Sequence, residues 1–313
     1  MKIKRSSLQE KKVYEAVVIG SGPAGLSAAL YLKRAGKNVV IIEKEYEGTG
    51  QIARSICVDN YLGVPSVSGE MLGESFRQHV LSEQVPILED EVTKISHEDI
   101  WQILLASGNS LEAETLVYAA GAIPRQLGIA GEQQYQGKGI SYCAYCDGSL
   151  YKGKDVAVVG GGDTALDDAL YFSDLCRKVY LIHRRAEFRG NAAVMERLKK
   201  RENVEILPKT TVYEVRGQKK LEEILLNNKK TIRVSGLFVA IGSDPATALI
   251  KKFVPLDEKG YVIAGEDGIT HAPGLFVAGD IRAKKLRQVV TAVSDGANAA
   301  VSAIQYLKMD RKR

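Results

Sequence analysis

The sequence has little of what secreted and membrane-spanning proteins depend on. Only 4 of its 313 residues are cysteine, which is too few for the disulfide framework of a secreted scaffold. No apolar run reaches the length of a membrane span, and residues 1–12 are polar and basic, without the apolar core of a signal peptide. We therefore expect a cytoplasmic protein that does not enter a membrane.

The charge of the chain is nearly balanced. Lysine and arginine total 43 and aspartate and glutamate total 38, which gives a net charge of +5. The basic residues form no stripe with interleaved aromatic side chains, so we expect no nucleic-acid partner. The length, the 45% hydrophobic content and the 30 glycines predict a soluble α/β protein of two domains with many tight turns.

The first motif lies close to the start of the chain. An apolar run at 15–20 ends in a glycine-rich turn, a helical pattern follows, and a second apolar run at 38–43 ends in the carboxylate of Glu43. A lone G-x-G-x-x-G is weak evidence, but this complete order is the dinucleotide fingerprint, in which a pyrophosphate approaches the helix N-terminus and the acid binds a ribose hydroxyl. The predicted nucleotide site consists of Gly20, Gly22, Pro23, Ala24, Gly25 and Glu43.

A second copy of the same pattern follows in the middle of the chain. A predicted strand at 155–160 leads into a G-x-G-x-x-A turn and a helix from about 163 to 176, and the next strand covers 178–183. Residues 204–207 echo the run at 85–88, and Gly242 to Pro245 echo Gly121 to Pro124. We interpret the chain as an internal duplication of a nucleotide-binding unit.

The two copies differ in the charge at the end of their second strand. Glu43 would repel a ribose 2′-phosphate, whereas a cluster of arginines would bind one through charge-assisted hydrogen bonds. The first site therefore suits FAD and the second suits NADPH, while His183 either contacts the nucleotide or only shapes the turn. The predicted NADPH site consists of Gly160, Gly162, Asp163, Thr164, Ala165, His183, Arg184, Arg185 and Arg189.

The fold prediction follows from the order of these units. The segment after Pro245 includes another apolar run that ends in Asp280 and an Ala-rich helix from about 288 to 308, and it most simply returns to the first unit. We predict two Rossmann-like, three-layer α/β domains, with the NADPH-binding domain inserted into a discontinuous FAD-binding domain. The predicted limits are 1–121 and 246–313 for the FAD-binding domain and 122–245 for the NADPH-binding domain, with a hinge at the two crossovers.

The pair Cys143 and Cys146 lies inside the inserted domain, and Asp147 follows it directly. Two cysteines at this spacing can form a small-ring disulfide at a turn that enters a helix, and the acid could supply protons to the sulfurs. The same spacing also occurs in half of a zinc site. Cys57 and Cys176 are isolated and the four histidines form no second ligand pair, so we favour the redox interpretation.

Together these motifs resemble the low-molecular-weight thioredoxin reductases over nearly the whole chain. The resemblance implies a homodimer with FAD and NADPH that passes electrons through the cysteine pair to thioredoxin, with a rotation of the NADPH-binding domain between the two half-reactions. It also implies that Cys146 lies nearer the flavin, that Cys143 attacks the partner and that Asp147 is the acid. Further flavin-site residues implied by the family are Gln51, Asn60, Gly121, Gly279, Asp280, Arg287, Gln288 and Val289.

The sequence departs from the family pattern in three places, and other functions stay open. Tyr145 stands where the family usually has threonine, the loop 48–51 is less regular, and aspartates occupy 167 and 168 in place of glutamates. One alternative is a flavin dithiol oxidase, which would not need the arginines of the second site. Another is an NADPH-dependent reductase of a different thioredoxin-like or glutaredoxin-like protein. A nucleotide-sensing binding protein would need neither cysteine.

Overall fold

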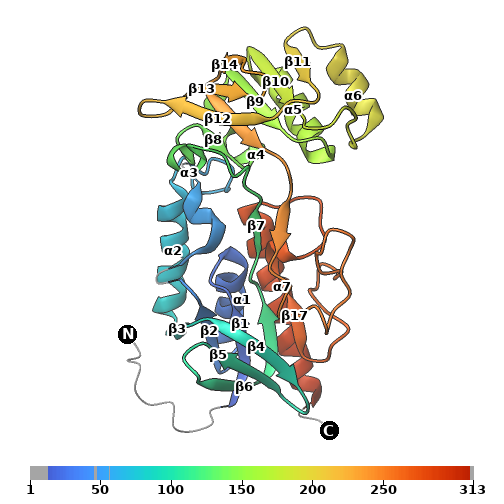
Figure 1. Cartoon of the computed structure of the whole chain (residues 1–313). Helices are drawn as coiled ribbons and strands as arrows, with labels where there is room; N and C mark the ends of the chain where they lie inside the picture. The colour runs from blue at the N-terminus through green and yellow to red at the C-terminus, as the bar shows by residue number, and fades with distance from the viewer. Residues whose placement is uncertain (1–12, 46–47, 56, 311–313) are drawn as a thin grey trace. The chain divides into compact units, whose positions relative to one another are not determined.

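The computed structural model describes residues 13–45, 48–55 and 57–310, so the polar stretch 1–12 lies outside the described residues. The chain divides into two compact units. The first contains the described residues of 1–54, 67–123 and 244–313, and the second contains those of 55–66 and 124–243 (Figure 1). The second unit therefore interrupts the first. The segment 55–66 lies within the limits predicted for the first domain but groups with the second unit.

The first unit is built on a seven-stranded sheet in the order β3-β2-β1-β6-β5-β4, with β17 also paired to β6. The strands β3, β2, β1, β6 and β17 run parallel, while β4 and β5 continue the sheet antiparallel. The strands are β1 (Val13–Ile19), β2 (Val39–Glu43), β3 (Ile87–Glu89), β4 (Val92–His97), β5 (Trp101–Leu105), β6 (Ser110–Tyr118) and β17 (Leu275–Val277).

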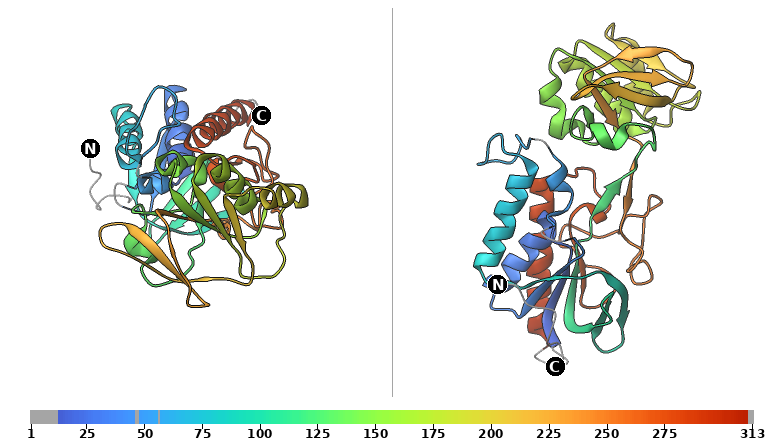
Figure 2. Two further views of the ribbon diagram at one scale, coloured as in Figure 1. Left: turned by 90° about the horizontal axis from the view of Figure 1, so that it is seen from above. Right: turned by 60° about the vertical axis from the view of Figure 1, so that its left-hand side comes forward.

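The central strands of this sheet are apolar at almost every position because both faces are covered. Val17 and Ile19 of β1 face one core, whereas Ala16 and Val18 face the other. The second core lies between the sheet and two packed helices, α1 and α7 (Figure 2). The helices and 3₁₀ turns of this unit are α1 (Pro23–Arg34), η1 (Gly50–Arg54), α2 (Gly69–Ser82), η3 (Gly279–Ile281) and α7 (Val289–Asp310).

The second unit repeats this plan on a smaller scale. Its five-stranded parallel sheet has the order β11-β10-β9-β15-β8, and an antiparallel sheet β12-β13-β14 accompanies it. The strands are β8 (Ile140–Ser141), β9 (Asp155–Val159), β10 (Lys178–Ile182), β11 (Val204–Leu207), β12 (Val212–Gly217), β13 (Leu221–Leu226), β14 (Thr231–Arg233) and β15 (Gly236–Val239). The helices and the 3₁₀ turn are α3 (Glu132–Tyr135), α4 (Ala144–Asp147), η2 (Gly148–Tyr151), α5 (Asp163–Leu175) and α6 (Ala192–Lys199).

The two crossovers form a two-stranded sheet of their own, from β7 (Ala122–Pro124) and β16 (Ser243–Pro245). The first crossover is thus a short strand and not only a hinge. Its partner is the segment that echoes it, and the backbone bonds are reciprocal: Arg125 donates to Gly242, and Ala246 donates to Gly121. The return of β17 to the first sheet and the paired crossovers confirm the predicted α/β fold with an inserted second unit. No helix among the described residues is long and apolar enough to cross a membrane.

Candidate active site

Cys143 and Cys146 form a disulfide at the start of the four-residue helix α4. Both cysteines are half-buried. The backbone N–H of Cys146 donates to the sulfur of Cys143 at 3.2 Å. A donor aimed at one sulfur stabilises that sulfur when it carries negative charge. The local fold therefore distinguishes the two cysteines and favours Cys143 as the thiolate of the reduced pair.

Asp147 is buried, and its two carboxyl oxygens have different surroundings. Oδ2 accepts a 2.6 Å hydrogen bond from the hydroxyl of Ser141, whereas Oδ1 is buried and has no hydrogen-bond partner. Burial raises the pKa of Asp147, and the nearby charge of Asp59 raises it further, while the Ser141 bond opposes the shift. A carboxyl group in this setting keeps its proton to a higher pH than an exposed aspartate does. This is the property that a proton donor to the disulfide needs.

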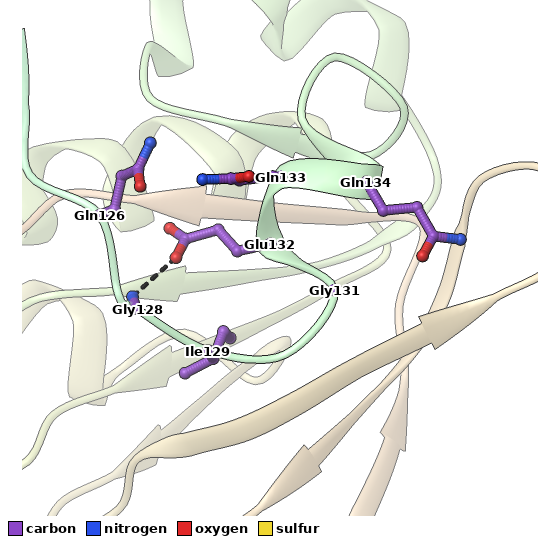
Figure 3. A pocket seen from close by; sticks show the side chains of 7 residues that line it. All are labelled: Gln126, Gly128, Ile129, Gly131, Glu132, Gln133 and Gln134. Carbon is purple, nitrogen blue, oxygen red and sulfur yellow. Dashed lines mark hydrogen bonds between the residues drawn. The ribbon is translucent and has the colours of Figure 1, made fainter.

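A second buried carboxylate, Glu132, fixes the approach to the cysteine pair. Glu132 is 2% exposed and accepts hydrogen bonds from the backbone of Leu127 and Gly128 and from the hydroxyl of Tyr142. Tyr142 directly precedes Cys143, so Glu132 links the loop that enters the second unit to the redox centre. The bond to Gly128 is drawn in Figure 3. Both residues line a depression of about 440 Å³, which is formed by Gln126, Gly128, Ile129, Gly131, Glu132, Gln133 and Gln134.

The segment 55–66 contacts the same short helix. The carboxylate of Asp59 accepts from the thiol of Cys57 at 2.8 Å and from the hydroxyl of Ser149 at 3.1 Å. Asn60 donates from its amide to the carbonyl of Tyr145 at 3.4 Å. Asn60, which resemblance assigns to the flavin site, thus lies beside the cysteine pair.

The glycines of the first fingerprint serve two different purposes. Gly20 has a φ of +99°, and a side chain on Gly25 would collide with the carbonyl oxygen of Gly20, so the fold itself requires both. Gly22 has φ −65° and ψ 175°, which any residue can adopt, and a β-carbon there would meet no atom closer than 3.9 Å. The protein leaves this space open. An approaching pyrophosphate explains why position 22 is a glycine, so the turn fits a dinucleotide.

Glu43 ends β2 directly beside the glycine-rich turn. One of its carboxylate oxygens accepts from both the backbone N–H and the hydroxyl of Ser21, each at 2.7 Å, and the other accepts from the backbone of Glu45. The predicted ribose acceptor is therefore held against the turn by Ser21. A carboxylate oxygen can accept more than one hydrogen bond, so Glu43 can bind a ribose hydroxyl in addition.

The carboxyl end of β17 leads to the same turn. A β-carbon on Gly279 would lie 2.8 Å from the side chain of Ala24, which places η3 against the start of α1. Asp280 Oδ1 is buried without a hydrogen bond and lies 3.5 Å from the ammonium of Lys284. Burial raises the pKa of Asp280, and the charges of Lys284 and Arg287 oppose that shift. An unpartnered buried acceptor at this position fits a hydroxyl-bearing cofactor.

Most of the predicted flavin-site residues therefore converge on the N-terminus of α1. Gly50, next to Gln51, lies against Gly22. Arg287 donates to the carbonyl of Asp280 at 3.3 Å. Residues of the set that lie at the carboxyl ends of the strands or at the start of α1 are Gly20, Gly22, Pro23, Ala24, Gly25, Glu43, Gly121, Gly279 and Asp280. Gln288 directly precedes α7 and its backbone N–H donates to the hydroxyl of Thr291, while Val289 is the first residue of the helix.

The second fingerprint has the same division of roles among its glycines. A side chain on Gly160 would collide with the carbonyl oxygen of Ala240, so the fold requires this glycine. Gly162 has a φ of −98°, which any residue can adopt, and a β-carbon there would meet nothing within 4 Å. The helix start at Asp163, Thr164 and Ala165 follows this open position. The turn at Gly162 thus fits a second dinucleotide for the same reason as Gly22 does.

His183 packs against this turn at Gly161. Its ring is 6% exposed, lies where a side chain on Gly161 would be, and contacts the carbonyl of Glu187 at 3.2 Å. Burial lowers the pKa of His183, and the neighbouring arginines lower it further. The neutral ring is therefore favoured, and of the two roles that the sequence left open the structure supports the shaping role.

Three exposed arginines surround the end of β10. Arg189 is tied to the turn, because its backbone donates to the carbonyl of Gly161 at 2.7 Å. Arg184 and Arg185 follow His183 directly, and all three side chains are exposed. None of the three forms an ion pair with a carboxylate in the described part of the chain. Unpaired guanidinium groups beside a dinucleotide turn are suited to a phosphate monoester.

Three polar residues of the site were not identified from the sequence. Ser141 donates to Asp147, Glu132 organises the approach to Cys143, and Ser21 holds Glu43. Each acts through a contact between segments whose spacing in the sequence is not regular. Only Ser21 carried a signal, because it lies inside the glycine-rich turn.

Comparison with known proteins places this geometry in a family. The family model for pyridine nucleotide-disulphide oxidoreductases matches residues 14–296. A thioredoxin reductase of Helicobacter pylori is 40% identical over 311 residues, covering 94% of this chain and 99% of the relative. A thioredoxin reductase of Mycoplasma genitalium is 38% identical over 300 residues, covering 94% and 95% of the two chains.

A solved structure agrees with these sequence matches. The crystal structure of a thioredoxin reductase from Streptococcus pyogenes matches with a TM-score of 0.90 and 34% identity, over 96% of this chain and 100% of that one. The match covers both units, including the cysteine pair of the second unit. The chain therefore belongs to the pyridine nucleotide-disulphide oxidoreductase family, as its resemblance to the thioredoxin reductases predicts.

Proposed function

We propose that this protein is an NADPH-dependent thioredoxin reductase that uses FAD and the Cys143–Cys146 disulfide. The observation that carries the proposal is the buried Asp147 next to that disulfide, with one oxygen held by Ser141 and the other without a partner. A protein that only bound nucleotides would need neither the disulfide nor the acid. The relatives named thioredoxin reductase support the choice of thioredoxin as the partner.

The first unit is proposed to hold FAD and the second to hold NADPH. The open space at Gly22, the acceptor Glu43 and the unpartnered oxygen of Asp280 support FAD in the first unit. The open space at Gly162 and the exposed Arg184 and Arg185 support NADPH in the second. When bound, the two cofactors supply the two electrons that convert the disulfide to a dithiol.

The residues of the chain then carry out the exchange with the partner. The Cys143 thiolate, stabilised by the N–H of Cys146, attacks one sulfur of the partner disulfide and forms a mixed disulfide, and the second partner sulfur leaves with the electron pair. Asp147 supplies a proton to a leaving sulfur. Cys146 then attacks Cys143, which restores the internal disulfide and releases the partner as a dithiol.

Three further parts of the proposal rest on the family and on composition. A homodimer and a rotation of the second unit between the two half-reactions come from the resemblance. A cytoplasmic location is supported by Cys57 and Cys176, which are free thiols of the kind that a reducing compartment maintains. Sedimentation of the FAD-loaded protein tests the dimer.

An anaerobic titration tests the proposal against its alternatives. The FAD-loaded protein is titrated with NADPH and separately with NADH while the flavin absorbance is followed, and oxidised thioredoxin is then added. We expect NADPH to bleach the flavin at far lower concentration than NADH, and thioredoxin to restore the colour. A flavin that NADPH leaves oxidised but that small dithiols bleach would support the dithiol oxidase instead. A flavin bleached by NADPH that glutaredoxin but not thioredoxin restores would support a different protein partner.

A further inference from the structure

Tyr145 carries an exposed ring that the proposed exchange does not use. It lies between the two reactive cysteines and is 53% exposed, whereas Cys143 and Cys146 are half-buried. The threonine that the family usually has at this position would offer a methyl group and no ring. An aromatic side chain buries a large apolar area when a partner covers it, and tyrosine is enriched at protein interfaces for this reason. The ring is therefore placed to meet a protein that approaches Cys143.

The ring of Tyr145 is supported by a second tyrosine. Its centroid lies 4.9 Å from that of Tyr171 on α5, which is a normal separation for an aromatic pair. Tyr171 in turn contacts Phe172, whose ring is buried in the core of the second unit and has its centroid 5.3 Å away. This packing restricts the rotamers of Tyr145 in the free protein, so less conformational entropy is lost when a partner covers the ring.

The glycine after Asp147 makes room for this support. Gly148 has φ −61° and ψ −35°, which any residue can adopt. A β-carbon there would nevertheless lie 2.7 Å from the ring of Tyr171 and 3.1 Å from that of Phe172, because the two rings occupy the space that a side chain would need. The turn that follows the cysteine pair is thus packed around the tyrosine on which Tyr145 rests.

The mixed disulfide brings the partner to this ring. A disulfide holds the β-carbons of its two cysteines only about 4 Å apart. A partner protein that is bonded to Cys143 must therefore lay the chain around its own cysteine over the surface next to Cys143, where Tyr145 is the exposed residue two positions further along the chain. A small disulfide reagent bonds to the same sulfur and has no chain to lay over the ring.

We propose that Tyr145 is a specificity-determining residue, whose ring packs against the apolar surface around the disulfide of the protein partner. The inference rests on the proposed function, in which Cys143 attacks thioredoxin or a similar protein. The ring contributes contact area only when the disulfide belongs to a protein. Tyr145 therefore favours protein disulfides over small ones and leaves the chemistry of the cysteine pair unchanged.

The test compares a protein disulfide with a small one. The FAD-loaded enzyme is reduced with NADPH and mixed in a stopped-flow instrument with oxidised thioredoxin or with 4,4′-dithiodipyridine, and only the phase that requires reduction by NADPH is analysed. Tyr145→Thr is expected to lower the second-order rate constant with thioredoxin by about 10-fold, the usual effect of truncating an aromatic residue within an interface. The rate constant with dithiodipyridine is expected to stay within about threefold of the wild type.

Two further variants separate the ring from its hydroxyl and from its position. Tyr145→Phe keeps the ring, and we expect both rate constants to stay within about threefold of the wild type. Tyr213→Thr is the matched control, because Tyr213 is also an exposed tyrosine of the second unit, on β12, and is 67% exposed. Neither rate constant is expected to change in this variant.

The outcomes separate this inference from the proposed function. A reduced wild-type enzyme that reacts with dithiodipyridine but not with thioredoxin overturns the proposed function. If the wild type reduces thioredoxin, the role of Tyr145 is overturned by Tyr145→Thr reacting with thioredoxin as fast as the wild type. An equal loss with both disulfides overturns it too, because the substitution would then act on the cysteine pair. A Tyr145→Phe variant as slow with thioredoxin as Tyr145→Thr also overturns it, since the ring would not be the contact.

Discussion

Replacing Asp147 by asparagine tests its role as a proton donor while leaving the structure around the disulfide nearly unchanged. The amide has nearly the shape of the carboxyl group and can still accept the hydrogen bond from Ser141, which is 2.6 Å long in the wild type. The disulfide and the N–H donor to Cys143 are untouched. The substitution therefore removes the acidic proton and little else. General acids typically contribute 10²- to 10⁴-fold to a rate, and we expect turnover to fall by about 100-fold.

The pH dependence of Asp147 gives this prediction a second part. Its pKa in the folded protein is raised above 3.8 by burial, so it carries its proton up to a higher pH than in the unfolded chain. Wild-type turnover should therefore decline as the pH rises through the raised pKa, and this decline should be absent in Asp147→Asn. The raised pKa also means that ionised Asp147 costs stability above that pH. At pH 8 the variant should be at least as stable as the wild type while being far less active.

The assay is the NADPH-driven appearance of thioredoxin thiols between pH 5 and 9, together with a thermal melt of each FAD-loaded protein. The control is Asp174→Asn, an exposed aspartate of α5 that pairs with Arg201 and is expected to change neither quantity. Turnover within threefold of the wild type across the pH range would refute the role of Asp147 as proton donor. A loss of turnover that comes with a lower melting temperature would show structural damage instead.

Four further variants test the cofactor sites and one buried acid. The backbone at Gly22 and at Gly162 accommodates an alanine whose β-carbon meets no close neighbour, so Gly22→Ala and Gly162→Ala should each leave the melting temperature of the apoprotein unchanged or higher. Gly22→Ala should weaken FAD binding, and Gly162→Ala NADPH binding, by at least ~10-fold in a fluorescence titration. Replacing Arg184 and Arg185 by alanine should raise the KM for NADPH by at least ~10-fold and leave that for NADH unchanged, because only NADPH carries the 2′-phosphate; equal effects on both would contradict the assignment. Asp168 is 7% exposed, and burial raises its pKa to about 7. The wild type should therefore lose up to about 4 kcal/mol of stability as the pH rises from 4 to 8, a loss that thermal melts of Asp168→Asn should not show.

The fold was largely predictable because its signals are local and periodic. Both glycine-rich turns, the strands before them and the helices after them lie where the sequence indicates, since each depends on residues close together in the chain. The segment 55–66 was not predictable in the same way. Its grouping with the second unit depends on contacts such as that between Asp59 and Ser149, which are 90 residues apart.

The candidate site was predictable in its reactive groups and not in the groups that support them. Cys143, Cys146 and Asp147 are adjacent and carry chemistry that the sequence displays directly. Ser141 and Glu132 are ordinary polar residues whose importance lies in the groups that they contact. No spacing rule distinguishes such a serine or glutamate from one that faces solvent, because its partner is set by tertiary packing.

The two copies of the fingerprint show that the residue at the end of the second strand has to match the residue that faces it in the turn. The backbone N–H of Gly20 bonds to Ile42 and that of Gly160 bonds to Ile182, so Glu43 and His183 occupy equivalent positions. The residue that faces each of them in the turn differs accordingly. Ser21 donates to the carboxylate of Glu43, whereas position 161 is glycine because the ring of His183 fills the space that a side chain would need.

The nature of the residue at the end of the second strand therefore determines what the turn can contain. A carboxylate needs a hydrogen-bond donor in the turn, whereas an imidazole ring needs a turn position that has no side chain. Exchanging only one member of a pair, as in Gly161→Ser, would force His183 out of its position and displace Arg184 and Arg185 with it. The charge that distinguishes the two nucleotide sites thus depends on a residue of the turn as well as on the arginines themselves.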